Sequence, residues 1–142
     1  MRIESTPHRL SIEPGDAWEV DPADPATVES FGLYLRSVAY GFYLNVRSEP
    51  VPDHPLTDAG LLAHLRSQSW ASPAFDEWVL HEGPLTVVGG SFETTGMNGE
   101  VVLEVYATDG THLVNLVGPA PREIVTAGTP DVQRLVRSLR LG

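Results

Sequence analysis

The stretch Val101–Val117 reads VVLEVYATDGTHLVNLV, and it decides the kind of fold that we expect. Two strand-like runs, Val101–Ala107 and Thr111–Val117, flank the pair Asp109-Gly110. An Asp-Gly pair in this setting favours a two-residue type I′ turn, because both central residues of that turn need a positive φ angle. The sequence therefore predicts a β-hairpin over this stretch.

A two-residue turn determines which residues lie opposite each other and on which face each side chain lies. The predicted pairs are Thr108 with Thr111, Ala107 with His112, Val105 with Val114, and Leu103 with Leu116. One face of the hairpin is then almost wholly apolar, as expected for a face against a core. The other face is mixed and carries Glu104, Tyr106, Thr108, Leu113 and Asn115. We expect this mixed face either to be solvated or to be covered by an amphipathic element.

Other parts of the chain supply partner strands for the hairpin. Further strand patterns lie at residues 8–13, 17–20, 40–47, 78–82 and 85–88. Residues 31–35 are compatible with one more strand, and the wider stretch 28–38 with a short helix, so both interpretations stay open. The two prolines in residues 21–25 predict a surface loop. Gly89-Gly90 allows a bulge or bend after the last of these strands.

Two segments carry the signals of amphipathic helices. Thr57 is a suitable N-cap for a helix over residues 58–68, with Asp58 at the positive end of the helix dipole. Near the C-terminus, residues 129–131 read Thr-Pro-Asp, which predicts a helix that begins at the proline. Val132, Leu135, Val136 and Leu139 follow with helical spacing. The sequence thus predicts an α+β fold, an antiparallel β-sheet flanked by helices, in a single domain over residues 1–142.

Composition narrows the classes of function. The formal net charge is −10, from 19 acidic against 9 basic residues, which disfavours nucleic acid and anionic membranes as partners. The absence of cysteine excludes disulfides, thiolate metal sites and cysteine nucleophiles. No run approaches the roughly 18 apolar residues of a membrane span, and the N-terminal residues lack the apolar region of a signal peptide. We therefore expect a cytoplasmic protein without membrane insertion.

The second half of the chain has an order of elements that suggests a family. It runs from residues 85–90 (LTVVGG) through the Asp109-Gly110 hairpin to residues 117–121 (VGPAP) and the closing segment 132–141. This order resembles the PsbP-like group, which includes the extrinsic P-subunit of photosystem II, a Ran-binding nuclear import factor, and bacterial DcrB-like and LpqN-like proteins. The resemblance implies a PsbP-like sandwich, and roles in binding, chaperoning or assembly rather than catalysis.

Few residue groups suggest chemistry. The residues of metal-ligand type that lie near one another in sequence are Asp53, His54, Asp58 and His64. Their spacing matches no established ligand motif, and a solvated loop and helix surface explains them better. His81 and Glu82 are neighbours on a predicted strand and therefore point to opposite sides, which argues against a shared acid–base role. We expect no catalytic residue, no metal site and no cofactor.

The leading hypothesis is a non-enzymatic protein-binding domain, such as an adaptor, chaperone or assembly factor. The residues expected at its binding surface are Tyr43, Tyr106, Leu113, Arg134 and Arg137. Arg134 and Arg137 belong to a basic strip that either serves the helix dipole and solvent or meets an acidic partner. A homodimer is one arrangement that such a surface permits.

Two other hypotheses come from different classes. One is a small-molecule-binding or enzymatic domain with a pocket between the sheet and the helix over residues 58–68, and with His81 or His112 as its polar anchor. His112 equally fits a packed residue or a rim residue near the turn, and Trp70 is the tryptophan that we expect to be partly exposed. The other hypothesis rests on the charge of −10 alone and is a partner for an Arg/Lys-rich protein.

Overall fold

A computed structural model describes residues 2–21, 25–68, 70, 72–94 and 100–142. The strands are β1 (Ile3–Ser5), β2 (Leu10–Ile12), β3 (Trp18–Val20), β4 (Leu33–Ser37), β5 (Tyr43–Glu49), β6 (Phe75–Glu82), β7 (Leu85–Glu93), β8 (Glu100–Thr108), β9 (Leu113–Pro121) and β10 (Arg140–Leu141). The helices are α1 (Pro25–Phe31), α2 (Asp58–Arg66) and α3 (Arg122–Arg137), with a 3-10 turn at Gly15–Ala17. The α+β prediction is confirmed.

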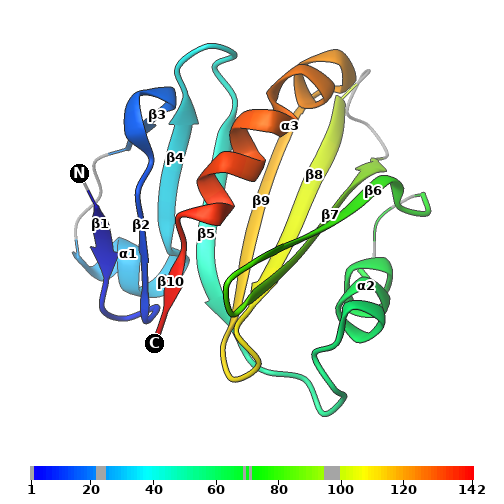
Figure 1. The fold of residues 1–142 in the computed structure, drawn as a ribbon. Helices are drawn as coiled ribbons and strands as arrows, with labels where there is room; N and C mark the ends of the chain where they lie inside the picture. The colour runs from blue at the N-terminus through cyan, green and yellow to red at the C-terminus, as the bar shows by residue number, and fades with distance from the viewer. Residues whose placement is uncertain (1, 22–24, 69, 71, 95–99) are drawn as a thin grey trace.

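The strands form two antiparallel sheets (Figure 1). The larger sheet has the order β3-β4-β5-β9-β8-β7-β6, and the smaller sheet has the order β1-β2-β10. Helix α3 crosses one face of the larger sheet, which we call the inner face, beside the smaller sheet (Figure 1). One hydrophobic core lies between the two sheets and α3. Its buried residues include Ile12, Leu44, Leu116, Val132 and Val136. None of the described helices is long and apolar enough to cross a membrane.

The hairpin β8–β9 forms, but its turn is longer than predicted. Thr108 pairs with Leu113 and Val105 with Leu116, so residues 109–112 make a four-residue loop. The side chain of Asp109 decides this, because its Oδ1 accepts the backbone N–H groups of Thr111 at 2.9 Å and His112 at 2.8 Å. The predicted register is therefore wrong by two positions. An even shift leaves every side chain on its predicted face.

The mixed face of the hairpin lies on the opposite, outer face of the larger sheet, where α2 covers part of it. Leu61 and Leu65 of α2 pack against a sheet cluster made of Val88, Phe92, Tyr106 and Leu113. Helix α2 begins as predicted, because the Thr57 hydroxyl accepts the N–H of Gly60 at 3.1 Å. Of the two alternatives for the mixed face, the structure shows the covered one.

Helix α3 begins eight residues before the predicted start. It runs from Arg122, so Pro130 lies inside the helix rather than at its first position. The apolar stripe explains the difference, because Val125 and Gly128 extend the spacing of Val132, Leu135 and Val136 backwards and all five are buried. Burial along this stripe outweighs the roughly 3 kcal/mol that an interior proline costs a helix.

Residues 28–38, for which a strand and a helix were both predicted, contain the end of a helix followed by a strand. Helix α1 ends at Phe31 and strand β4 begins at Leu33, with Gly32 between them at a φ of 88°. The loop predicted over residues 21–25 falls largely on residues 22–24, which lie outside the described residues. The only irregularity in the β6–β7 pairing lies in β6, between Phe75 and Trp78, and Gly89 and Gly90 are regular residues of β7.

Candidate functional site

Helix α2 leaves the other half of the outer face uncovered, and a cavity of about 300 Å³ lies there. We call this surface the aromatic face. Its residues come from β4, β5, β8, β9 and the segment after α2, and they are Tyr34, Tyr43, Asn45, Trp70, Val102, Val117, Gly118 and Pro119. The cavity lies at the small end of the size range of ligand sites in proteins.

Strand alternation aims these side chains outward. In β5, Leu44 and Val46 are fully buried in the core, so Tyr43 and Asn45, which alternate with them, point to the other side. In β4, Leu35 is buried in the same core, and Tyr34 therefore joins Tyr43 on the outer face. Tyr43 is 43% exposed and is one of the large apolar side chains that the described part of the chain leaves open to solvent.

A second groove of about 280 Å³ adjoins the first. The two share Tyr43 and Pro119, so they meet at these two residues. The other lining residues of the second groove are Tyr40, Gly41, Phe42, Glu100, Ala120, Pro121 and Ile124. Together the two grooves make one extended, largely apolar surface with Tyr43 at its centre.

A buried carboxylate borders the aromatic face where α2 begins to cover the sheet. Glu104 is only 4% exposed, and its oxygens accept hydrogen bonds from the Trp70 indole at 2.6 Å, the Tyr106 hydroxyl at 2.9 Å and the Asn115 amide at 3.3 Å. Burial and the nearby charge of Glu104 raise the pKa of Tyr106 well above its usual range, so this hydroxyl remains a donor. The cluster therefore holds the Trp70 ring in place as a wall of the cavity.

The charges around the aromatic face are mostly paired. Arg36 contacts Glu19 at 3.3 Å, and Arg47 contacts Glu49 at 3.6 Å. Glu100, in the second groove, has no basic group within 4.0 Å in the part of the chain that the structure describes. The surface is therefore aromatic and slightly acidic.

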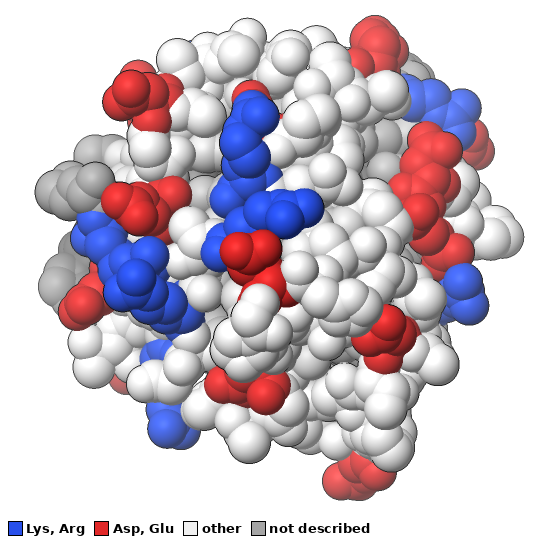
Figure 2. Space-filling view, viewed as in Figure 1, with Lys and Arg blue, Asp and Glu red and all other residues white. Residues whose placement is uncertain are grey.

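The structure separates the five residues predicted to bind. Tyr43 lies on the aromatic face, but Tyr106 and Leu113 are 2% and 1% exposed beneath α2, so placing them on an exposed surface was wrong. Arg134 and Arg137 lie beyond the inner face, in the group of basic side chains over α3 (Figure 2). Arg134 pairs with Asp131, and Arg137 contacts Glu82 at 3.2 Å.

The histidines also have local partners. His81 contacts Asp58 of α2 at 2.9 Å, and His64 packs edge-on against Tyr106, with ring centroids 4.7 Å apart. His112 contacts Asp109 at 3.2 Å and is a rim residue of the hairpin loop, one of its two predicted positions. Within residues 2–21, 25–68, 70, 72–94 and 100–142, no three His, Asp or Glu side chains gather as a metal site would require.

The space between α2 and the sheet holds no room for the predicted pocket. Six side chains fill it, each no more than 2% exposed: Leu61, Leu65, Val88, Phe92, Tyr106 and Leu113. His81 and His112 lie outside this cluster, on Asp58 and Asp109 respectively. A ligand pocket on this side of the molecule belongs instead to the aromatic face.

This arrangement of sheets and helices matches a known fold. The solution structure of cyanobacterial PsbP (CyanoP) from Synechocystis sp. PCC 6803 superposes with a TM-score of 0.60 over 100% of this chain and 92% of that chain, at 13% sequence identity. The fold is PsbP-like. The predicted resemblance is thereby confirmed for the fold. No model of a protein family matches the sequence, and no curated protein does.

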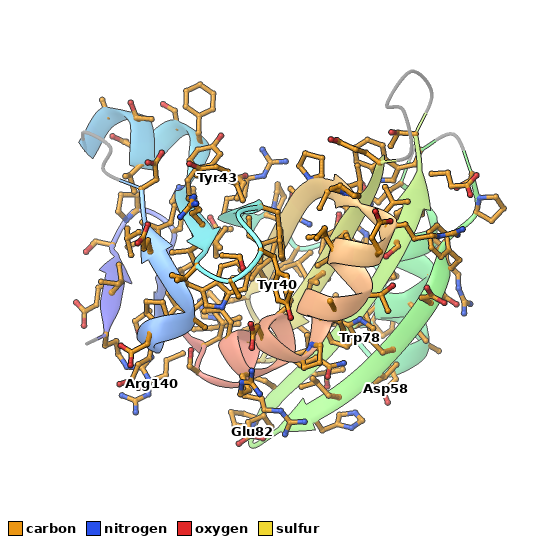
Figure 3. All side chains as sticks on the ribbon, turned by 90° about the horizontal axis from the view of Figure 1, so that it is seen from above. Tyr40, Tyr43, Asp58, Trp78, Glu82 and Arg140 are labelled. Atoms are coloured by element: carbon orange, nitrogen blue, oxygen red, sulfur yellow. The ribbon has the colours of Figure 1, made fainter. Side chains whose placement is uncertain are left out.

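Within the PsbP-like fold, sequence reasoning missed most of the aromatic face. Tyr34 alternates with Leu33 and Leu35, and this pattern would have placed it beside Tyr43 had residues 31–35 been assigned to a strand. Trp70, at 37% exposure, is partly exposed as predicted. Its position beside Val102 and Val117 depends on the path of the chain after α2 and has no local signal. Figure 3 shows Tyr43 well apart from Arg140 and Glu82, on the other side of the molecule.

Proposed function

We propose that this protein is a non-enzymatic protein-binding domain that holds a partner polypeptide on its aromatic face. The observation that carries the proposal is the exposed Tyr43, which lines both of two adjoining grooves of about 300 and 280 Å³. Exposed apolar patches of this kind on a soluble domain commonly mark interaction sites. Tyrosine and tryptophan are also the residues most enriched among those that dominate binding energy.

The shape of the surface favours an extended segment as the bound element. The two grooves follow one another along β5 and β9, so a chain laid over Tyr43 would fill both in succession. Pro119 and Pro121 add rigid apolar walls that lose little conformational entropy on binding. A partner with apolar side chains at intervals along an extended segment fits this geometry.

The negative charge of this protein favours some of these partner segments over others. The chain carries a net charge of −10, and the grooves add the unpaired Glu100 among the described residues. Long-range attraction therefore favours a partner segment that carries basic residues beside its apolar ones. We place this interaction in the cytoplasm, and a second copy of the chain is the less favoured occupant because two such surfaces repel each other.

Site-specific photocrosslinking tests the proposal. A photoreactive phenylalanine analogue replaces Tyr43 in one variant and Val51 in a control, because Val51 is a 47% exposed apolar residue away from the grooves. We expect one discrete crosslinked protein in the source organism at Tyr43 and none at Val51. The purified partner should then bind the Tyr43→Ser variant about tenfold or more weakly than the wild type.

The outcomes separate the alternatives. A crosslink to a second copy of this chain, with a dimer in sedimentation, assigns the face to self-association and contradicts a foreign partner. A strict monomer that yields no crosslinked protein at Tyr43 contradicts the proposed function as a whole.

A second candidate function is supported by the cavity beside Trp70. Its lining is almost wholly apolar and its volume suffices for a small ligand. Apolar ligands bound there should quench or shift the fluorescence of Trp70, and a Val117→Trp substitution that fills the cavity should abolish the response. Tyr40→Ser, which changes only the second groove, should leave this fluorescence response intact and weaken the binding of a partner segment, so the two functions are distinguishable.

A further inference from the structure

The chain has nine arginines and no lysine, and most of these arginines contact an acidic side chain. Seven have a carboxylate oxygen within 4.0 Å: Arg2, Arg36, Arg47, Arg66, Arg122, Arg134 and Arg137. Arg9 and Arg140 have no such partner in the described part of the chain. Both are exposed, so their guanidinium groups are open to solvent in a protein that has 19 acidic residues.

Both unpaired arginines line the same cavity. It has a volume of about 390 Å³ and lies at the smaller sheet, where basic side chains gather over β1, β2 and β10 (Figure 2). The lining residues are Glu4, Ser5, Thr6, Arg9, Leu10, Ser11, Arg140, Leu141 and Gly142. These residues are brought together from the two ends of the chain by the pairing of β2 with β1 and β10.

The register of the smaller sheet places polar side chains in one row. Ser11 of β2 lies opposite Glu4 of β1 on one side and opposite Arg140 of β10 on the other. Directly paired residues of antiparallel strands project from the same face of a sheet. Arg140 therefore stands on the same face as a hydroxyl and one carboxylate.

Arg9 is held in an unusual backbone conformation. Its φ angle is 55°, in the left-handed region that side chains other than those of Asn, Asp and Gly seldom adopt. The surroundings impose this conformation, because the N–H of Arg9 donates to Thr6 at 3.1 Å and its carbonyl accepts the N–H of Gly142 at 2.8 Å. A glycine would occupy this position with less strain, so folding alone does not explain the arginine.

We propose that this cavity binds a small oxyanion, a phosphate or carboxylate group, between Arg9 and Arg140. A guanidinium group presents its N–H donors in a planar fork that matches the oxygens of both anions, often in bidentate fashion. Ser11 adds a hydroxyl on the same face as Arg140, whereas Ser5 pairs with Leu10 and points to the buried face of the smaller sheet. Glu4 opposes the anion, so the side chains that line the cavity carry a net charge of +1, from two arginines against one glutamate.

Nuclear magnetic resonance tests the site directly, because the chain has nine arginine Nε–Hε signals and no lysine to compete for the anion. Sodium phosphate is titrated into the full ¹⁵N-labelled chain at constant ionic strength. We expect saturable shifts of the Arg9 and Arg140 signals, while the signal of Arg36, which is paired with Glu19, stays unchanged. Equal and non-saturating shifts of all nine signals indicate ionic screening and overturn the proposal.

Variants separate binding from folding. Arg9→Gly should weaken phosphate binding about tenfold or more while leaving the urea unfolding midpoint equal or higher, since glycine adopts a φ of 55° without strain. Arg140→Gln should weaken binding to a similar degree. Glu4→Gln should strengthen binding several-fold, because it removes the opposing charge. The control Arg36→Gln removes one positive charge elsewhere and should leave the affinity unchanged.

The outcomes decide the proposal and the source of the anion. Unchanged affinity in both Arg9→Gly and Arg140→Gln contradicts the site, as does an equal loss in Arg36→Gln. A second titration uses sodium acetate at the same ionic strength, and its affinity is compared with that of phosphate. Tighter binding of phosphate assigns a phosphoryl ligand, and tighter binding of acetate assigns a carboxylate, such as that of an acidic side chain.

Discussion

Gly89 in β7 leaves room for an aromatic ring from the neighbouring strand. It pairs with Trp78 of β6, and a Cβ atom at this position would overlap the indole of Trp78. The ring packs against the main core. A glycine ordinarily lowers the stability of a strand. Here the packing of the Trp78 ring offsets that loss of stability.

Gly89→Ala should therefore destabilise the protein, although alanine is the more favourable residue in a regular strand. We expect a loss of about 1–3 kcal/mol in the free energy of unfolding, measured in urea, because the indole must move away from a well-packed site. In a Trp78→Leu background the same change should cost much less. Equal costs in the two backgrounds would show that the ring does not occupy this space.

Asp109 determines the loop between β8 and β9 and responds to pH. Burial favours its neutral form, but hydrogen bonds from the N–H groups of Thr111 and His112 outweigh this and lower the pKa of Asp109 to about 2, from 3.8. A lowered pKa in the folded state means that the carboxylate stabilises the fold above pH 3.8 and that this stabilisation is lost as the pH falls towards 2.

Asp109→Asn keeps an oxygen acceptor for the two N–H groups but removes the charge. Between about pH 5 and pH 2, the wild type should lose about 1–2 kcal/mol more stability than this variant, as measured by urea unfolding. Asp109→Ala should be less stable than Asp109→Asn at neutral pH, because it also removes the acceptor. Parallel pH profiles for the wild type and Asp109→Asn would contradict the role of the charge.

At the scale of elements, α3 shows how an apolar stripe overrides a local stop signal. Pro130 has no N–H group to donate to the carbonyl of Thr126, yet the helix continues through it. Gly128 lies against the Phe42 ring, so this part of α3 approaches β5 and its preceding turn closely. Packing of the segment before the proline therefore keeps it helical.

Pro130→Ala should stabilise the protein by about 1–3 kcal/mol. The substitution restores an N–H donor inside α3 and removes a ring from the helix, although greater freedom of the unfolded chain reduces the gain. Thermal or urea unfolding measures the effect. The matched change Pro121→Ala, just before the helix, should give no such gain, and a less stable Pro130→Ala variant would mean that the proline ring itself is needed for packing.

At the scale of the whole molecule, the two candidate binding surfaces differ in charge and lie on different sides of the larger sheet. The aromatic face lies on the outer face of the larger sheet, and the arginine-lined cavity lies at the smaller sheet beyond the inner face. The exposed edge strand β6 carries Asp76, Glu77 and Glu82, and such charges oppose pairing of the edge with another chain. Self-association through this edge is therefore disfavoured.

A net charge of −10 also predicts how stability depends on salt. At neutral pH, raising sodium chloride from about 10 to 200 mM should raise the unfolding temperature by a few degrees, because salt screens the repulsion among carboxylates. The effect should shrink towards about pH 4, where many carboxylates are protonated. A stability that falls with salt at neutral pH would show that the ion pairs contribute more than the repulsion.

Much of the fold follows from the sequence alone, because strand and helix patterns are local. The alternation in residues 101–117 gave the correct face to the side chains of β8 and β9 within this stretch, and Thr57 marked the start of α2 correctly. The side-chain periods of 2 in a strand and 3.6 in a helix do not depend on which elements pack against it, because they follow from the geometry of that one element. The same reasoning placed Tyr43 on the outer side of β5.

Only the tertiary structure decided which surfaces stay open. The register of the hairpin depended on hydrogen bonds to one carboxylate, and the burial of Tyr106 and Leu113 depended on where α2 lies across the sheet. The meeting of Arg9 with Arg140 required strand pairing between the two ends of the chain. Such contacts join residues that are distant in sequence, and their free energy comes from burial and pairing that no local pattern records.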